Sequence, residues 1–253
     1  MATVEGTALV VGGSSGIGAA CAEALAAAGW GTVVLDLKPA DGADAVALDV
    51  RDRDAVFAAV AELARTKGEL GTVVYAAGTA RVKPILEVEP REWDLVLGVN
   101  LSGAFNVLQA AAPHIAKRGS FTAISSIDSR APVPGLAPYC ASKAGLEALV
   151  RSAALELGPA GVRCNAVLPG LVRTPLMEGQ LARPGVEDAF VAQTPLRGIA
   201  GGGEVADVVA FLASPAARWI TGASIPVDGG MSLTEHPKLD PQAPRTSAST
   251  NSA

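Results

Sequence analysis

The chain has 253 residues, enough for one large α/β domain or two small ones, and its 49% hydrophobic content supports a large core. Its 20 Lys and Arg residues against 25 acidic residues leave a net charge of -5, which argues against a nucleic-acid surface. Three cysteines indicate a reducing, cytoplasmic compartment. The chain shows neither a secretory signal nor an apolar run near the ~20 residues that cross a bilayer, so we expect no membrane contact.

Strand-like and helical patterns alternate as far as Val227 and predict one domain over residues 1–233. The expected elements begin with strand Thr7–Val11, loop Gly12–Gly18, a helix to about Ala28, strands Thr32–Leu35 and Val46–Leu48, helix Arg53–Lys67 and strand Thr72–Tyr75. They continue with helix Trp93–Lys117, strand Ser120–Ile124, helix Pro138–Leu157, strand Arg163–Leu168 and strand Ser224–Val227. Apolar strands that alternate with helices predict an α/β fold, a doubly wound parallel sheet of about seven strands between two helical layers, as in a Rossmann fold.

Two segments stand outside this alternation. Thr174–Gly203 is loop-rich with short helical pieces, and we expect it to form a lid over the substrate. Thr234–Ala253 is a polar tail rich in Pro, Ser and Thr, which we expect to be mobile or docked on a partner subunit.

A glycine-rich loop joins the first strand to the first helix. Glycines in Gly12–Gly18 permit a tight turn and close approach to a pyrophosphate, which the N-terminus of the following helix can bind. Asp36 ends the second strand, where a carboxylate can accept both ribose hydroxyls of an adenosine and would repel a 2′-phosphate. Ser15 and Leu37 are not basic, and Lys38 is the nearest cation, so the sequence favours NAD over NADP.

A candidate catalytic set lies in the second half of the chain. Tyr139 and Lys143 are four residues apart, about one helical turn, so the phenol and the ammonium share a helix face. A nearby cation lowers the pKa of a phenol, whose reference value is about 10. Ser126, thirteen residues before Tyr139, ends an apolar strand. A phenol with a lowered pKa could move a proton to or from an alcohol.

With these pieces in place, the chain resembles the short-chain dehydrogenase/reductase family, in its compact single-domain branch, from about Thr7 to Met231. The resemblance rests on several motifs in the family's order: the glycine loop, Asp49-Val50, Asn100, Ser126, Tyr139-x-x-x-Lys143, Pro169-Gly170 with Thr174, Thr221-Gly222 and Val227-Asp228-Gly229-Gly230.

The resemblance implies a role for each matching residue. Tyr139 would be the general acid/base, Lys143 would lower its pKa and hold the nicotinamide ribose, and Ser126 would polarise the substrate oxygen. Asn100 would shape its helix locally and hold a water that links Lys143 to solvent. The implied cofactor residues are Gly12, Ser14, Ser15, Gly16, Ile17, Gly18, Asp36, Leu37, Asp49, Val50, Ala76, Ala77, Gly78, Asn100, Tyr139, Lys143, Pro169, Gly170, Val172 and Thr174.

Two positions depart from the family pattern. Val11 replaces the usual Thr before the glycine loop, and Tyr75-Ala76-Ala77-Gly78 replaces Asn-Asn-Ala-Gly. These positions help tie neighbouring strands together in the family. We therefore predict that an apolar contact between Val11 and Ala76 replaces the polar tie, because exchanging both partners of a polar pair can be nearly neutral.

The best reading is reversible hydride transfer between NAD and a secondary alcohol or ketone. We expect the substrate to contact Ser126, Asp128, Val133, Leu136, Leu171 and Met177, with further apolar walls from Ile127, Val172, Leu181 and Phe190. This lining favours an apolar or cyclic compound. Asp128 and Arg130 also read as a loop ion pair. His114 and His236 lack ligand-spaced companions, so no metal is expected.

Two alternatives stay open. One is an NADPH-dependent 3-ketoacyl or polyketide-type ketoreductase, which Asp36 opposes. The other is a dinucleotide-binding regulatory protein without turnover, which the intact set of Asn100, Ser126, Tyr139 and Lys143 opposes. The resemblance also implies that the two long helices, Trp93–Lys117 and Pro138–Leu157, pair with copies of themselves in a homodimer or homotetramer.

Overall fold

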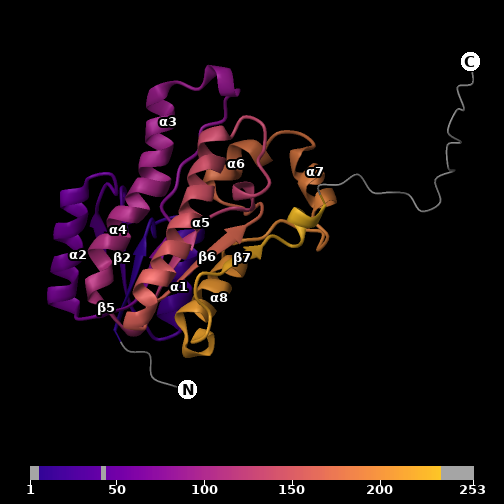
Figure 1. The fold of residues 1–253 in the computed structure, drawn as a ribbon. Helices are drawn as coiled ribbons and strands as arrows, with labels where there is room; N and C mark the ends of the chain where they lie inside the picture. Colours follow the sequence, from indigo (N-terminus) through magenta and orange to yellow (C-terminus); the bar gives the residue numbers. More distant parts are fainter. Residues whose placement is uncertain (1–5, 41–43, 235–253) are drawn as a thin grey trace, which may run out of the picture.

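A computed structural model describes residues 6–40 and 44–234 of the chain and contains one seven-stranded sheet (Figure 1). The strands lie in the order β3-β2-β1-β4-β5-β6-β7, and every pair of neighbours is parallel. Their bounds are β1 Thr7–Val11, β2 Gly31–Asp36, β3 Ala45–Ala47, β4 Leu70–Tyr75, β5 Ile115–Ile124, β6 Arg163–Pro169 and β7 Ser224–Val227. The predicted fold class is confirmed.

Helices cover both faces of this sheet, as expected from strands that are buried throughout. The helices are α1 Gly16–Ala27, α2 Arg53–Lys67, α3 Pro90–Leu97, α4 Gly103–Ala111, α5 Ala137–Leu157, α6 Pro175–Leu181, α7 Val186–Gln193 and α8 Gly202–Ala213. Side chains of α2, α4 and α5 pack on one face with Leu9 and Val11 of β1. Side chains of α1 and α8 pack on the other face with Ala8 and Val10, so successive β1 residues feed two separate cores.

The sheet order reverses between β1 and β4, and this reversal positions the site. From β1 the chain runs outward to β2 and β3, then returns to β4 on the other side. In such sheets ligands bind outside the carboxyl ends of the strands at the reversal. Gly12 follows β1 there with a positive φ of 79°, and a Cβ on it would lie 2.5 Å from the Ala77 nitrogen. The two strand ends therefore meet closely because one of them carries a glycine.

The prediction of a helix over Trp93–Lys117 is wrong in two respects: the helix ends earlier, and it is not α-helical throughout. The helical run covers Pro90–His114, and Ile115 already begins β5, which extends to Ile124. A π-helical turn, Gly98–Ser102, interrupts the run and contains Asn100. By length and composition alone this run could cross a membrane, contrary to the sequence-based expectation. Half of its most apolar window is buried inside the domain, and core helices pass the same test.

One further helix was missed, and the lid was partly anticipated. No element was predicted for the region of α8. Val205, Val209 and Leu212 nevertheless repeat at helical spacing, and all three are fully buried. The predicted lid contains the two short helices α6 and α7 (Figure 1). The predicted polar tail lies outside the described residues beyond Thr234.

Candidate active site

A cavity of about 820 Å³ runs along the carboxyl ends of the strands. Its wall includes the predicted cofactor residues Gly12, Ser15, Gly16, Ile17, Gly18, Asp36, Leu37, Asp49, Val50, Ala76, Ala77, Gly78, Tyr139, Lys143, Pro169, Gly170, Val172 and Thr174. The predicted substrate residues Ser126, Asp128, Val133, Leu136, Leu171 and Met177 line the same cavity. Ser14 and Asn100 do not line it. The structure thus brings together residues spread over most of the chain.

The glycine loop forms a cradle that side chains would fill. A Cβ on Gly18 would lie 1.9 Å from the Gly12 carbonyl oxygen, so the start of α1 packs directly on the loop. Gly16 has a positive φ of 53°, and a Cβ there would lie 3.3 Å from Cγ2 of Thr174. The loop therefore presents bare backbone and the first turn of a helix to the cavity. These are the features that bind a dinucleotide pyrophosphate.

The Asp36 carboxylate is oriented by backbone donors. The Ser14 N–H donates to its Oδ2 at 3.0 Å and the Lys38 N–H donates to its Oδ1 at 3.0 Å. Each carboxylate oxygen keeps a further acceptor position, so the group can still receive ribose hydroxyls. Ser14 takes part through this contact rather than at the cavity wall, and its own hydroxyl accepts from the Ala40 N–H at 3.2 Å. The cradle and this acceptor fit a dinucleotide with a free ribose.

Asp49 forms an ion pair with Arg51, which was not among the predicted site residues. Arg51 donates to both carboxylate oxygens of Asp49, at 3.0 Å from Nε and 2.5 Å from Nη2. These hydrogen bonds hold the pKa of Asp49 below its ordinary value. Arg51 also lines the cavity. The predicted cofactor residue Asp49 is therefore held in an ion pair, and the only signal of this pair in the sequence is the spacing Asp49-x-Arg51.

Tyr139, Ser126 and Lys143 meet at the other end of the cavity. Tyr139 lies in the first turn of α5, and Lys143 follows one turn later with its Nζ 5.5 Å from the centre of the Tyr139 ring. Ser126 lies two residues beyond the carboxyl end of β5, with its hydroxyl close enough to the phenol to lower the pKa of Tyr139. The predicted grouping of hydroxyl, phenol and ammonium is present in the structure.

The expected lowering of the Tyr139 pKa by Lys143 is not observed. Desolvation by the surrounding protein raises the pKa of Tyr139 to about 12, although the nearby Ser126 hydroxyl lowers it. Lys143 donates instead to the Ile124 carbonyl at 2.8 Å, and burial lowers the pKa of Lys143 to about 8. At neutral pH the phenol is therefore protonated and can act as an acid.

Asn100 acts behind the cavity wall. It is fully buried, and its Nδ2 donates to the Thr79 carbonyl at 3.0 Å and to Ser142 Oγ at 2.9 Å. Its Oδ1 accepts the Thr79 N–H at 2.8 Å. The side chain thus fixes the loop after β4 to α5. The π-helical turn around Asn100 agrees with the expected local distortion of its helix.

The Tyr75 side chain stabilises this π-helical turn through a hydrogen bond. In an α-helix the Gly103 N–H would bond to the Val99 carbonyl, but here it bonds to the Gly98 carbonyl. The Tyr75 hydroxyl donates to the Val99 carbonyl at 2.5 Å instead. Tyr75 is fully buried, and burial raises its pKa above the ordinary value. The residue that departs from the family pattern therefore has a hydrogen-bonding task of its own.

The predicted contact between Val11 and Ala76 is wrong. Val11 packs in the core beneath α2, α4 and α5, whereas Ala76 packs against the core on the opposite face. Residues at successive positions of a strand point to opposite sides, and Val11 is in register with Tyr75. The strands are tied by the Ala76 N–H, which donates to the Val11 carbonyl at 2.8 Å.

The expected pair of Asp128 and Arg130 is also wrong. Arg130 extends away from the cavity and binds Glu147 at 2.7 Å. Asp128 stays in the cavity wall, where burial raises its pKa and a hydrogen bond with Ser126 lowers it. Of the four further walls predicted, Ile127, Val172 and Phe190 line the cavity, but Leu181 is buried elsewhere.

Several lining residues were not predicted. They come mainly from the loop after β4, from α3 and from the π-helical turn: Thr79, Ala80, Arg81, Val82, Leu95 and Val99. This loop follows a predicted strand end at the reversal of the sheet order, which was the available signal. The cavity is therefore bordered by the loop after β4 as well as by the predicted lid.

Comparisons with known proteins agree with this geometry. A family model described as enoyl-(acyl carrier protein) reductase matches residues 11–232. The chain is 40% identical over 248 residues to (3R)-3-hydroxyacyl-CoA dehydrogenase of Rattus norvegicus, covering 88% of this chain and 95% of that protein. It is 35% identical to the 3-oxoacyl-(acyl-carrier-protein) reductase of Staphylococcus aureus (strain N315), covering 89% of this chain and 97% of that protein. The ligand-free aldohexose dehydrogenase of Thermoplasma acidophilum superimposes with a TM-score of 0.89 at 29% identity, covering 94% of this chain and 98% of that one.

Proposed function

The chain belongs to the short-chain dehydrogenase/reductase family, and on that premise we propose that it transfers a hydride between NAD and a secondary alcohol or ketone. As a member of this family it is an oxidoreductase that acts on hydroxyl or keto substrates. One observation carries the proposal: Ser126, Tyr139 and Lys143 meet at one end of a cavity that contains Asp36 at its other end. An extended dinucleotide would reach from one end to the other.

The bound nicotinamide supplies the hydride donor or acceptor, and the chain's own residues handle the oxygen and its proton. Ser126 donates a hydrogen bond to the substrate oxygen. Tyr139 gives its proton to that oxygen when a ketone is reduced and takes it back when an alcohol is oxidised. Because desolvation raises the pKa of Tyr139 to about 12, the protonated form, which ketone reduction requires, prevails at neutral pH. Lys143 holds the nicotinamide ribose hydroxyls.

The choice of NAD rests on Asp36. Its carboxylate is held in place by the Ser14 and Lys38 N–H groups and would face a 2′-phosphate with like charge. The similarity to a 3-oxoacyl-(acyl-carrier-protein) reductase supports an alternative, an NADPH-dependent 3-ketoacyl or polyketide-type ketoreductase. Rates with NADH and NADPH at matched concentrations separate the two, and a strong preference for NADPH would exclude our assignment.

The substrate is proposed to be an apolar or cyclic carbonyl compound. The wall beside Tyr139 is mainly apolar and includes Ile127, Val133, Leu136 and Leu171. The relationship to a (3R)-3-hydroxyacyl-CoA dehydrogenase adds 3-oxoacyl thioesters to the candidates. A cytoplasmic homotetramer or homodimer is the assembly we propose, and light scattering that returned a monomer would contradict it.

The test is a panel of ketones, 3-oxoacyl thioesters and secondary alcohols followed by NADH absorbance. Tyr139→Phe should reduce turnover of any substrate found by about 10²- to 10⁴-fold, because it removes the acid/base group. Cofactor affinity, measured by NADH fluorescence, should change much less. Unchanged turnover in this variant would refute the mechanism. Turnover lacking throughout the panel, with dinucleotide still bound, would favour the regulatory alternative.

A further inference from the structure

Glu147 is a buried carboxylate on α5 to which the proposed reaction gives no part. It lies one turn after Lys143 and two turns after Tyr139, and its side chain is only 4% exposed. It does not line the cavity. Burying a carboxylate is costly unless it is both paired and hydrogen-bonded. The partners of Glu147 therefore indicate what its burial achieves.

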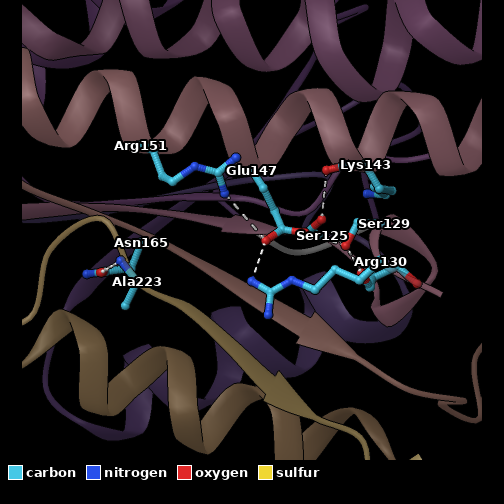
Figure 2. A network of polar contacts seen from close by, with 9 residues as sticks. Ser125, Ser129, Arg130, Lys143, Glu147, Arg151, Asn165 and Ala223 are labelled. Atoms are coloured by element: carbon cyan, nitrogen blue, oxygen red, sulfur yellow. Dashed lines mark hydrogen bonds and ion pairs between the residues drawn. The ribbon is translucent and has the colours of Figure 1, made fainter. Parts of the chain in front are cut away.

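Two of these partners come from the short turn that follows Ser126. Ser129 donates a short hydrogen bond to Oε1 of Glu147, and Nη2 of Arg130 lies 2.7 Å from Oε2 (Figure 2). A third partner, Arg151, belongs to α5 itself and lies farther away, at 3.8 Å. The buried Ser224 hydroxyl on β7 also faces the carboxylate, but its geometry falls short of a hydrogen bond. The strongest contacts thus link α5 to another element.

Residues of the same turn hydrogen-bond both the carbonyl and the hydroxyl of Ser126. The Ser129 N–H donates to the Ser126 carbonyl at 3.1 Å, and the Ser129 hydroxyl lies 2.6 Å from that carbonyl oxygen. The Asp128 N–H donates to the Ser126 Oγ at 3.1 Å. Any shift of this turn relative to α5 would therefore move the Ser126 hydroxyl relative to the phenol of Tyr139.

Three successive turns of α5 are joined to the end of β5 and the residues that follow it. In the first turn the Tyr139 phenol lies beside the Ser126 hydroxyl, which lowers its pKa. In the second, Lys143 Nζ donates to the Ile124 carbonyl, and the Lys143 carbonyl accepts from Ser125 Oγ at 3.1 Å (Figure 2). In the third turn Glu147 binds the segment that contains Ser129. The first two levels contain reacting groups, and the third lies behind them.

We propose that Glu147 is a positioning residue that ties the turn after Ser126 to α5 and so sets the placement of Ser126 against Tyr139. The assignment rests on the proposed function, because it gives Glu147 a part in that reaction. The alternative is an ion pair that only stabilises the fold. The two differ in what happens to the hydride step, since small misplacements of reacting groups lower the rate strongly.

The test uses the full-length protein and five variants. Glu147→Ala should lower kcat about tenfold with little change in the NADH dissociation constant, because the nucleotide end of the cavity is distant from the turn. Ser129→Ala should lower kcat less than Glu147→Ala. The double variant should have a kcat no lower than that of Glu147→Ala, because both substitutions remove the same connection between the turn and α5. Glu147→Gln should be intermediate, since its amide oxygen can still accept from Ser129. Arg151→Ala is the matched control and should keep wild-type kcat.

Two further readouts separate positioning from stability. The primary deuterium isotope effect on kcat should rise in Glu147→Ala, because hydride transfer becomes more rate-limiting. Amide hydrogen exchange over residues 127–130 should increase in Glu147→Ala and Glu147→Gln, with β1 and β4 unchanged. If Glu147→Ala yields too little folded protein, Glu147→Gln carries the same two measurements.

The proposal is overturned if both Glu147 variants keep wild-type kcat and isotope effect while losing only thermal stability. It is also overturned if Arg151→Ala lowers kcat as much as Glu147→Ala. Failure of the proposed function looks different, because Tyr139→Phe would then leave turnover unchanged as well.

Discussion

The two sides of the cavity are built in contrasting ways. On the sheet side, Asn100, Ser126 and Lys143 are at most 6% exposed, and Asn100 and Lys143 bond to residues from other elements of the fold. On the lid side, α7 has no buried residue. Main-chain attachments of the lid include the bridge between Val172 and Ala200 and the hydrogen bond from the Leu196 N–H to the Gly229 carbonyl at 3.1 Å.

This contrast separates the chemistry from the choice of substrate. Segments with few buried contacts open at low free-energy cost, whereas densely bonded segments open only with the whole domain. The sheet side can therefore keep the reacting groups fixed while the lid side adapts to the substrate or moves to admit it. The following predictions test the contrast, starting with the largest expected effect.

Gly18→Ala should break the sheet side at its nucleotide end. A Cβ on Gly18 would lie 1.9 Å from the Gly12 carbonyl oxygen, so the loop must move. We expect NADH affinity to fall by about 100-fold or more, judged from the cost of such misplacements. Fluorescence titration with NADH measures this effect. Gly31→Ala is the control, since no atom lies within 4 Å of its added Cβ, and binding by Gly18→Ala at wild-type strength would contradict the cradle geometry.

Tyr75→Phe should weaken the sheet side without touching the cavity. The change leaves the buried Val99 carbonyl without its hydroxyl donor, which costs about 1–3 kcal/mol of the free energy of unfolding. Urea denaturation measures the loss. Tyr139→Phe is the same chemical change at the other tyrosine of the chain, and it should lower turnover much more than stability. Equal stability loss in both variants would mean that the support of the π-helical turn is unimportant.

Lys143 should make stability depend on pH in the alkaline range. Burial lowers its pKa to about 8, whereas the unfolded chain keeps the ordinary value near 10.4. Between these values the unfolded state binds more protons, so the contribution of Lys143 to stability rises with pH, by at most about 1.4 kcal/mol per pH unit. Chemical denaturation of wild type and Lys143→Met at pH 8 to 9.5 measures the difference. A constant difference would show that the ammonium is not buried as described.

Arg173→Ala should affect only the lid. Arg173 binds Glu187 at 2.8 Å, but both side chains are about half exposed, and exposed pairs contribute little to stability. We expect an unchanged melting temperature and an altered KM for the ketone or alcohol, with the same result for Glu187→Ala. A large drop in melting temperature would show that the lid is as firmly built as the sheet side.

Local patterns in the sequence predicted most of the sheet side. The strands that precede Gly12, Asp36 and Ser126 were found because each is an apolar run that ends in a polar or glycine residue. The spacing of Tyr139 and Lys143 placed both on α5, and the structure gathers them with Ser126. These features depend on residues close together in the chain.

Features that depend on distant partners were not predictable in the same way. The π-helical turn needs Tyr75 below it, and it packs on α5 where Gly145 leaves room for Leu101. The pKa of Tyr139 was misjudged because the helical spacing placed Lys143 nearby but gave no measure of how strongly the phenol is desolvated. The Arg130 pair was misassigned because its partner is seventeen residues away.

The fit between Tyr75 and Gly103 has a consequence for how this sequence can vary. A Cβ on Gly103 would lie 2.7 Å from the Tyr75 hydroxyl and 2.6 Å from Cγ2 of Val50, so the small residue leaves the room that the phenol occupies. Substitutions at positions 75 and 103 should therefore be coupled. Relatives with a shorter side chain at position 75 should tolerate alanine or serine at 103. Those with tyrosine should keep glycine there, and an alignment of homologues would reveal the pair as covarying.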